Sequence, residues 1–246
     1  MFVLNMDRLF RNSANQSHCR HGTVRGAVWI DFGTVGTIFS YYTATMGQPL
    51  CDIKFEAWDA MLGFHWKTWW DAVFAHPLLT FIFAVCYSSF PVQICLAIIY
   101  FSHKQVPDRN RELLWIAILS GVIVSLISGF LPASGAFEYF GVPEFASHLL
   151  VLTALRESGA HSFQLGKTEG IVTFPSYHTI MAIYFIYIFR GYPFLFCTIS
   201  TINGVIILSV FTHGGHYLVD VISGAFVAIS TICTVRYFSA RFAPEN

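Results

Sequence analysis

The sequence contains few charged residues and no excess of either sign. Only 11% of its 246 residues are charged, with 14 Lys and Arg against 14 Asp and Glu. An average soluble domain has about 25% charged residues, so an ordinary soluble globule is excluded. The charge balance excludes the basic surface typical of nucleic-acid binding. The 55% of hydrophobic residues excludes a disordered chain.

Cysteine is also scarce, and its placement excludes two kinds of site. The chain has six cysteines, and no Cys-x-x-Cys pair occurs. Only Cys51 is expected in an outer segment, where it has no cysteine partner. We therefore expect neither a disulfide framework nor a cysteine metal site.

Long apolar runs, by contrast, are abundant. Six stretches approach the roughly 20 residues that cross a bilayer as a helix; they are 27–46, 77–101, 113–132, 172–189, 193–212 and 216–238. Backbone in lipid must pair its own polar groups, which favours helices. We predict an all-α polytopic membrane protein, a single domain over residues 1–246 built as a six-transmembrane-helix bundle. Pro91 should kink the second span, and the small residues Gly121, Ser125 and Gly129 should pack against another helix.

Positive charge is distributed unevenly between the alternating extramembrane segments. With the N-terminus inside, the inner segments hold ten Lys and Arg and the outer segments hold four. The positive-inside rule then predicts that both termini are cytoplasmic. Residues 1–26 lack the apolar core of a signal peptide and are expected to form a cytoplasmic tail. The expected location is a bacterial inner membrane, with the outer segments facing the periplasm.

Two outer segments stand out. Residues 47–76 carry Trp58, Trp66, Trp69 and Trp70 among charged residues, which predicts a helix lying in the membrane interface. A role in covering a substrate is the alternative. Residues 133–171 form a long outer loop with a short helix expected near 144–157. Loops of this length in compact proteins are usually functional.

The first polar cluster of interest lies at the outer start of the fourth span. It runs from Phe174 to Thr179 and contains Pro175, Ser176 and His178. Proline suits the first turn of a helix, because its missing N–H would be unpaired there. A helix start offers free N–H groups and a partial positive charge to an anion such as phosphate. Ser176 and His178 can add side-chain donors.

The second cluster precedes the sixth span and contains His216 and Asp220. At i, i+4 the two residues can share a helix face, so the acid can accept the Nδ1–H of the histidine. That leaves Nε2 free as a base or nucleophile. Gly214 and Gly215 let the backbone approach a ligand and present N–H groups. A metal site of His213, His216 and Asp220 is a less favoured alternative.

A helical hairpin that turns near Arg190–Pro193 brings both clusters to the outer side. Two histidines, one with an acid partner, beside an anion-binding helix start supply what phosphoryl transfer requires. The two arms of the hairpin differ by about 12 Å in rise, which requires tilted helices.

At these residues the chain resembles the type 2 phosphatidic-acid phosphatase superfamily. Pro175-Ser176-Tyr177-His178 is similar to its Pro-Ser-Gly-His signature, and His216 with Asp220 to the end of its Ser-Arg-x5-His-x3-Asp signature. Val210 occupies the arginine position, and the basic first signature is absent. With His-Gly-Gly-His-Tyr at 213–217, the chain looks most like the branch that includes inositol phosphorylceramide synthase and its bacterial relatives.

The resemblance implies a role for each site residue. His216 would attack phosphorus and become a phosphohistidine, Asp220 would orient it, and His178 would protonate the leaving group. Ser176 would bind phosphate. Because the arginines are missing, Arg156 is the first candidate for the phosphate-binding cation and Lys167 the second. The family needs no metal or other cofactor.

The resemblance leaves two enzyme activities open. A lipid phosphatase acting on a lipid phosphate or diphosphate transfers the phosphoryl group to water and needs no dedicated acceptor site, so it is preferred. A phosphotransferase would move a phosphoryl or head-group phosphate to a lipid or sugar alcohol. A transporter with intramembrane His and Asp is a remote third reading, because spans three, five and six are largely apolar or small at their centres. The expected partners are a membrane lipid and the bilayer, without nucleic acid.

Overall fold

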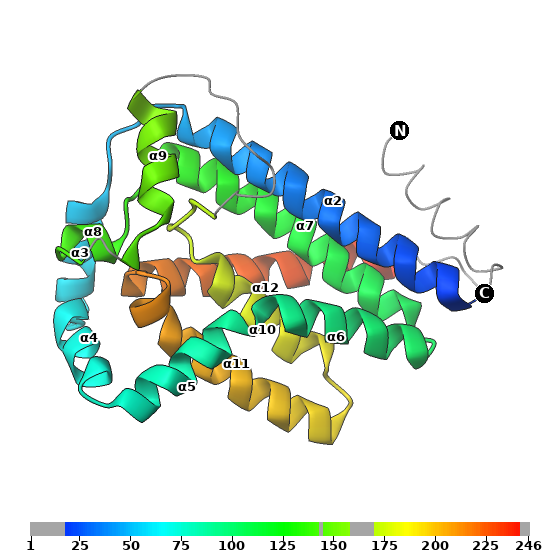
Figure 1. Cartoon of the computed structure of the whole chain (residues 1–246). Helices are drawn as coiled ribbons and strands as arrows, with labels where there is room; N and C mark the ends of the chain where they lie inside the picture. Colours follow the sequence, from blue (N-terminus) through cyan, green and yellow to red (C-terminus); the bar gives the residue numbers. More distant parts are fainter. Residues whose placement is uncertain (1–17, 143–144, 158–169, 242–246) are drawn as a thin grey trace.

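The computed structural model describes residues 18–142, 145–157 and 170–241, and this part of the chain contains helices and no β-strand (Figure 1). In chain order the helices are α2 (His18–Ala44), α3 (Asp52–Met61), α4 (Trp66–Phe74), α5 (Pro77–Ser88), α6 (Phe90–His103), α7 (Pro107–Phe130), α8 (Ala136–Tyr139), α9 (His148–Glu157), α10 (Tyr177–Ile188), α11 (Pro193–His213) and α12 (Leu218–Arg241). The prediction of an all-helical protein is confirmed. Residues 1–17 of the predicted cytoplasmic tail lie outside the described residues, and residues 18–26 form the first part of α2.

Among the described residues, three helices are long and apolar enough to cross a membrane: α7, α11 and the Leu218–Ser239 part of α12. A fourth span results if α4 and α5, which meet at an angle of 109°, count as one broken span. Helix α2 has 27 residues but a less apolar composition, and α10 has only 12 residues, about 18 Å of rise. The chain is therefore an integral membrane protein with three to four candidate spans, and the prediction of six is supported only in part.

The second predicted span is interrupted where Pro91 predicts a kink. Helix α5 ends at Ser88 and α6 starts at Phe90, so Pro91 is the second residue of the new helix. A proline is tolerated there because its missing N–H has no partner in the first turn. The stretch 77–101 therefore forms two helices, and the break places the last turn of α5 beside the first turn of α10.

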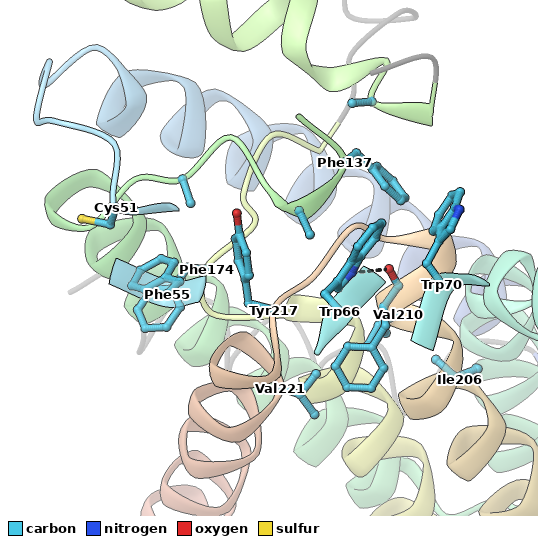
Figure 2. Close-up of a cluster of buried hydrophobic side chains, with 14 of the residues drawn as sticks. Cys51, Phe55, Trp66, Trp70, Phe137, Phe174, Ile206, Val210, Tyr217 and Val221 are labelled. Atoms are coloured by element: carbon cyan, nitrogen blue, oxygen red, sulfur yellow. Dashed lines mark hydrogen bonds between the residues drawn. The ribbon is translucent and has the colours of Figure 1, made fainter. Parts of the chain in front are cut away.

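The first outer segment differs from the single interfacial helix expected for it. It forms two short helices, α3 and α4, and its aromatic residues belong largely to the protein core (Figure 2). Trp66 and Trp70 are buried and stack with ring centroids 5.0 Å apart. The Trp66 indole Nε1–H donates to the Phe211 carbonyl at 3.0 Å. Only Trp58 is exposed to the degree that an interfacial anchor requires, at 45%.

Helix α2 packs along α7 on the small-residue face that the sequence predicts (Figure 1). An added Cβ at Gly129 would lie 2.9 Å from the Thr43 Cβ, and one at Gly121 would lie 3.3 Å from the Phe32 ring. The two helices thus approach too closely for larger side chains at these positions.

Helix α10 lies at the centre of the bundle, in contact with α7, α11 and α12. Its end at Ile188 is held by a cluster of charged and aromatic groups. Arg190 donates to both carboxylate oxygens of Glu112 at 3.0 Å, and its guanidinium lies 3.7 Å from the centroid of the Tyr187 ring. The Tyr187 hydroxyl also donates to Glu112. The opposite end of α10 lies beside the histidines described below.

Candidate active site

The turn between α11 and α12 brings His216 and Asp220 into contact. The His216 Nδ1–H donates to the Asp220 carboxylate at 3.2 Å, and both side chains are buried. His216 lies in the turn before α12, so the pair does not share a helix face as the i, i+4 spacing suggested. The contact still fixes the ring so that Nε2 carries no hydrogen, which makes it a nucleophilic nitrogen.

The start of α12 explains why Asp220 lies where it does. Tyr217 occupies the position before the helix, and its backbone N–H donates to the Asp220 carboxylate at 2.8 Å. An acid at the third helical position commonly reaches back in this way, because the first N–H groups of a helix have no partner inside it. One carboxylate oxygen, Oδ1, has no hydrogen-bond partner among the described residues. Asp220 is thus held by backbone geometry and can orient the neighbouring imidazole.

Burial keeps His216 neutral. It lowers the pKa of His216 to about 4, and a backbone contact with Thr173 acts in the opposite direction. A neutral imidazole at pH 7 has a free electron pair on Nε2 and can attack an electrophile.

The two predicted clusters are joined directly through the backbone. The Ser176 N–H donates to the Asp220 carbonyl at 3.0 Å. Helix α10 begins at Tyr177, so Pro175 precedes the helix instead of lying in its first turn as predicted. The Ser176 hydroxyl accepts from the Thr179 N–H at 3.4 Å and from the Thr179 hydroxyl at 3.1 Å. Ser176 is fully buried and caps α10, and it does not line the cavity described next.

A cavity of about 570 Å³ is lined in part by histidines. Its wall includes four of them: His148, His178, His213 and His216. Among the described residues, the wall contains no lysine or arginine. Away from the histidines the cavity continues along α2 and α7, where small residues predominate: Gly33, Gly36, Thr37, Ser40, Gly121 and Ser125.

His178 lies against an aromatic surface that the sequence analysis did not identify. The Tyr87 ring stacks on the imidazole with centroids 4.3 Å apart and an interplanar angle of 20°. The Tyr87 hydroxyl lies 3.4 Å from the His178 Nδ1, and the Phe90 ring is 5.3 Å away. A tyrosine at the end of a predicted apolar span carries no distinctive spacing, so only the break at Ser89 reveals its position.

Gly214 and Gly215 are required by close packing of the turn. An added Cβ at Gly214 would lie 2.7 Å from the His216 ring, and one at Gly215 would lie 2.6 Å from the Phe137 ring. Gly215 also has a φ of 62°, which glycine adopts readily. The Gly214 N–H donates to the Val210 carbonyl at 2.9 Å, whereas the Gly215 N–H has no partner in the described part of the chain. Of the two predicted phosphate-binding residues, Gly214 lines the cavity but its N–H is paired, whereas Gly215 has an unpaired N–H but does not line the cavity.

Helix α3 supplies two buried carboxylates that accept hydrogen bonds from the segments around this turn. Asp59 accepts from the N–H groups of Leu218 and Val219 at 2.6 and 2.9 Å and so caps α12. Asp52 accepts from the Ser134 and Gly135 N–H groups and from the Tyr217 hydroxyl. Burial raises the pKa of Asp59, while the bonds from α12 act in the opposite direction. The seven-residue spacing of the two acids on one helix face was the available signal in the sequence.

The predicted phosphate-binding cations do not lie on the described cavity wall. Arg156, in the last turn of α9, donates to the Gln48 carbonyl at 2.7 Å. Lys167 lies outside the described residues. Val210, at the arginine position of the resemblance, is fully buried, and its carbonyl accepts from the N–H groups of Gly214 and His216. A valine there packs in the core cluster of Figure 2 and brings no charge to the site.

The described residues contain no group of three or more His, Cys, Asp or Glu arranged to hold a metal ion. His213 lines the cavity, but its Nδ1 contacts the Thr212 hydroxyl at 3.0 Å. It does not join His216 and Asp220 in a common set of ligands, so the geometry does not favour the alternative metal site.

Comparison with known proteins gives one match. No curated protein and no solved structure matches this chain. The family model described as the PAP2 superfamily, which includes lipid phosphatases and phosphotransferases, matches residues 54–234. That range covers well over half of the chain and contains both histidine clusters, Asp59 and Tyr87. The chain therefore belongs to the PAP2 superfamily.

Proposed function

We propose that the protein is an integral-membrane lipid phosphatase that hydrolyses a lipid phosphate or diphosphate through a phosphohistidine intermediate. The observation that carries the proposal is that His216, paired with Asp220, and His178 line the same cavity. One histidine has a free electron pair and an acid partner, and the other is available to move a proton. These are the two groups that a two-step phosphoryl transfer requires.

In the first step, the Nε2 of His216 forms a bond to phosphorus as the bond from phosphorus to the lipid oxygen breaks. Asp220 accepts the Nδ1–H and stabilises the positive charge that develops on the ring. His178 gives a proton to the departing alkoxide. In the second step, His178 removes a proton from water, whose oxygen displaces His216 and releases phosphate. The second step restores both rings.

The oxygens of the phosphoryl group need hydrogen-bond donors in both steps. We propose the Gly215 N–H, which has no partner among the described residues, as one such donor, although Gly215 itself does not line the cavity. We propose that Arg156 is the first candidate for a cation, since its Nη1 has no hydrogen-bond partner among the described residues while its Nη2 donates to the Gln48 carbonyl, and that Lys167 is the second. Two variants, Arg156→Ala and Lys167→Ala, test this assignment. Loss of a charge-assisted partner of the phosphate costs about 2–5 kcal/mol. At least a tenfold fall in kcat/KM is expected for the variant that removes the cation, and wild-type activity in both would transfer the role to backbone amides.

The substrate is proposed to be a lipid because the cavity extends from the histidines between two helices that lie in the membrane bundle. Phosphatidic acid, phosphatidylglycerol phosphate, a polyprenyl diphosphate and a sphingolipid phosphate all fit this description. The resemblance to the inositol phosphorylceramide synthase branch supports transfer to an alcohol as the competing outcome.

One assay separates these outcomes. Purified protein in detergent is given each lipid class with and without an alcohol acceptor and with and without a chelator, and both free phosphate and new lipid products are measured. Phosphate release that does not depend on the acceptor supports the phosphatase. A new phosphodiester or phosphorylated alcohol without phosphate release would replace it with a phosphotransferase. Inactivity towards every phosphate ester would overturn the proposed function.

The site is proposed to face the periplasm of a bacterial inner membrane, with both termini in the cytoplasm. Figure 1 shows α3, α8 and α9 gathered at one end of the bundle, the end that was assigned to the outer side by charge. In a background without the six native cysteines, Lys54→Cys and Lys104→Cys should react with an impermeant thiol reagent from opposite sides of the membrane. Reaction of both from the same side would overturn this orientation.

A further inference from the structure

Tyr87 has a geometric relation to His178 that complements the one between Asp220 and His216. The hydroxyl of Tyr87 faces Nδ1 of His178 at 3.4 Å, just as the carboxylate of Asp220 faces Nδ1 of His216 at 3.2 Å. The chemistry of the two partners differs. A carboxylate can only accept a hydrogen bond, whereas a phenol can donate one.

This difference allows the two histidines to hold opposite tautomers. Asp220 requires a hydrogen on the His216 Nδ1 and leaves Nε2 bare. A hydrogen bond donated by Tyr87 requires a bare Nδ1 on His178 and leaves the hydrogen on Nε2. The bare nitrogen suits a nucleophile, and the N–H suits a donor to the leaving oxygen. The Phe90 ring, with its centroid 5.3 Å from that of the imidazole, adds to the apolar surroundings of His178.

We propose that Tyr87 is a positioning residue that holds His178 in the Nε2–H tautomer, an inference that rests on the proposed function. The Nε2–H bond of His178 breaks as the O–H bond of the leaving alcohol forms. The electron pair left on the ring is stabilised by the hydrogen bond from Tyr87. The ring then regains its proton from the water that attacks the phosphohistidine.

Packing around the hydroxyl supports a fixed position for it. An added Cβ at Gly214 would lie 3.0 Å from the Tyr87 hydroxyl oxygen. The hydroxyl therefore lies between the His178 ring and the backbone of the turn that carries His216. Tyr87, which belongs to a third element, α5, thus lies beside both histidine-bearing segments.

The kinetic test is Tyr87→Phe, which keeps the stacked ring and removes only the hydroxyl. We expect kcat on a lipid phosphate to fall about ten- to hundredfold with KM within about twofold, since general acid catalysis contributes about 10²–10⁴-fold. An aryl phosphate needs little protonation of its leaving group, so its kcat should change less than about threefold. Adding Tyr87→Phe to His178→Ala should cause no further loss. The matched control is Tyr100→Phe, which removes a hydroxyl from a half-buried tyrosine of α6 that does not line the cavity.

A spectroscopic test distinguishes failure of this inference from failure of the proposed function. Nitrogen-15 NMR of histidine-labelled protein reports which ring nitrogen of His178 carries the hydrogen, with the signal assigned by its absence in His178→Gln. In wild type the Nε2–H form should predominate, and Tyr87→Phe should shift the population towards Nδ1–H. An Nδ1–H form in wild type, or an unchanged tautomer in Tyr87→Phe, would overturn the inference even in an active enzyme. The expected shift in a protein inactive on all phosphate esters would support the tautomer assignment and overturn only the phosphatase.

Discussion

The two ends of the central helix α10 differ in how their polar groups are paired. At the Ile188 end, Glu112 is paired with Arg190 through two hydrogen bonds and also accepts from Tyr187. At the Tyr177 end, the described residues of the cavity wall include four histidines and no lysine or arginine. Asp220 keeps one oxygen without a partner among the described residues. At the Ile188 end the carboxylate is thus paired with arginines, whereas at the Tyr177 end the carboxylate has no cation on the described cavity wall.

The difference separates a structural cluster from a reactive one. A paired and partly exposed salt bridge fastens helices together and gains little from the exact position of each atom. Incompletely satisfied buried groups cost stability, and proteins retain them mainly where function depends on them. Substitutions at the Ile188 end should therefore change stability more than turnover, and those at the Tyr177 end should do the reverse.

The largest effect is expected from removing the nucleophile. His216→Ala should abolish turnover of both lipid and aryl phosphates and prevent formation of an acid-labile phosphoenzyme. Asp220→Asn should lose less, because the nitrogen remains while the tautomer is lost; the analogous change in serine proteases costs about 10⁴-fold. Trapping of labelled phosphate on the protein measures both. Phosphoenzyme formed by His216→Ala would assign the nucleophile to another residue.

The next largest effect is expected from Gly214→Ala. The new Cβ would lie 2.7 Å from the His216 ring and 2.8 Å from the Val210 carbonyl, so the turn must move. Misplacement of a reacting group by about 1 Å can cost about 10²-fold in rate, and kcat should fall by about that factor. The matched control is Gly204→Ala in α11, the helix that ends just before Gly214. The new Cβ at Gly204 meets nothing within 4 Å. Full activity in Gly214→Ala would show that the close approach is not needed for catalysis.

Loss of the α3 cap should affect both stability and activity. Asp59→Ala removes the acceptor for two N–H groups of α12. A lost helix cap costs about 0.5–2 kcal/mol, and kcat should also fall because the same turn carries Asp220. Thermal unfolding and phosphate release measure the two effects, with Lys54→Ala, an exposed site on the same helix, as the control. Wild-type stability and wild-type activity in Asp59→Ala would show that this cap does not support the site.

The buried histidine should also make stability depend on pH. The folded pKa of His216 is lowered to about 4, and an unfolded histidine titrates near 6.5. As pH falls from about 6.5 towards 4, the unfolded chain binds a proton that the folded chain does not, so stability decreases in this window. The thermal midpoint of His216→Gln should therefore decrease less than that of wild type between pH 7 and pH 5. Parallel decreases would indicate that His216 is protonated in the fold.

The smallest effect on catalysis is expected at the Ile188 end. Glu112→Ala removes the partner of Arg190 and should lower the free energy of unfolding by about 1–2 kcal/mol, since the pair is only partly buried. The kcat of the folded enzyme should stay within about twofold of wild type. Asp108→Ala, which breaks the exposed pair with Arg111 at 2.8 Å, is the control and should change neither quantity measurably. A large fall in kcat for Glu112→Ala would show that the two ends are coupled.

Much of the architecture could be predicted from the sequence because it depends on local patterns. Apolar runs of sufficient length specify helices in lipid, and each predicted stretch contains at least one described helix. The interruption of the helix next to Pro91 and the close approach of a neighbouring helix at Gly121 and Gly129 likewise follow from residue type alone. The spacing of His216 and Asp220 was enough to predict their contact, although the contact arises from the capping of α12 and not from a shared helix face.

Tertiary structure decided what no local pattern encodes. Trp66 and Trp70 fit a lipid interface by composition, but packing against Phe137 buries them within the protein. The turn after α11 folds back to the Val210 carbonyl, and His216 lies on the cavity that His178 also lines. The carboxylates of α3 reach the start of α12, and the hydroxyl of Tyr87 reaches His178, only because helices distant in sequence meet at one end of the bundle. Contacts between such distant residues depend on how whole helices pack, so the sequence determined the two histidines and Asp220, and the fold determined the support from α3 and Tyr87.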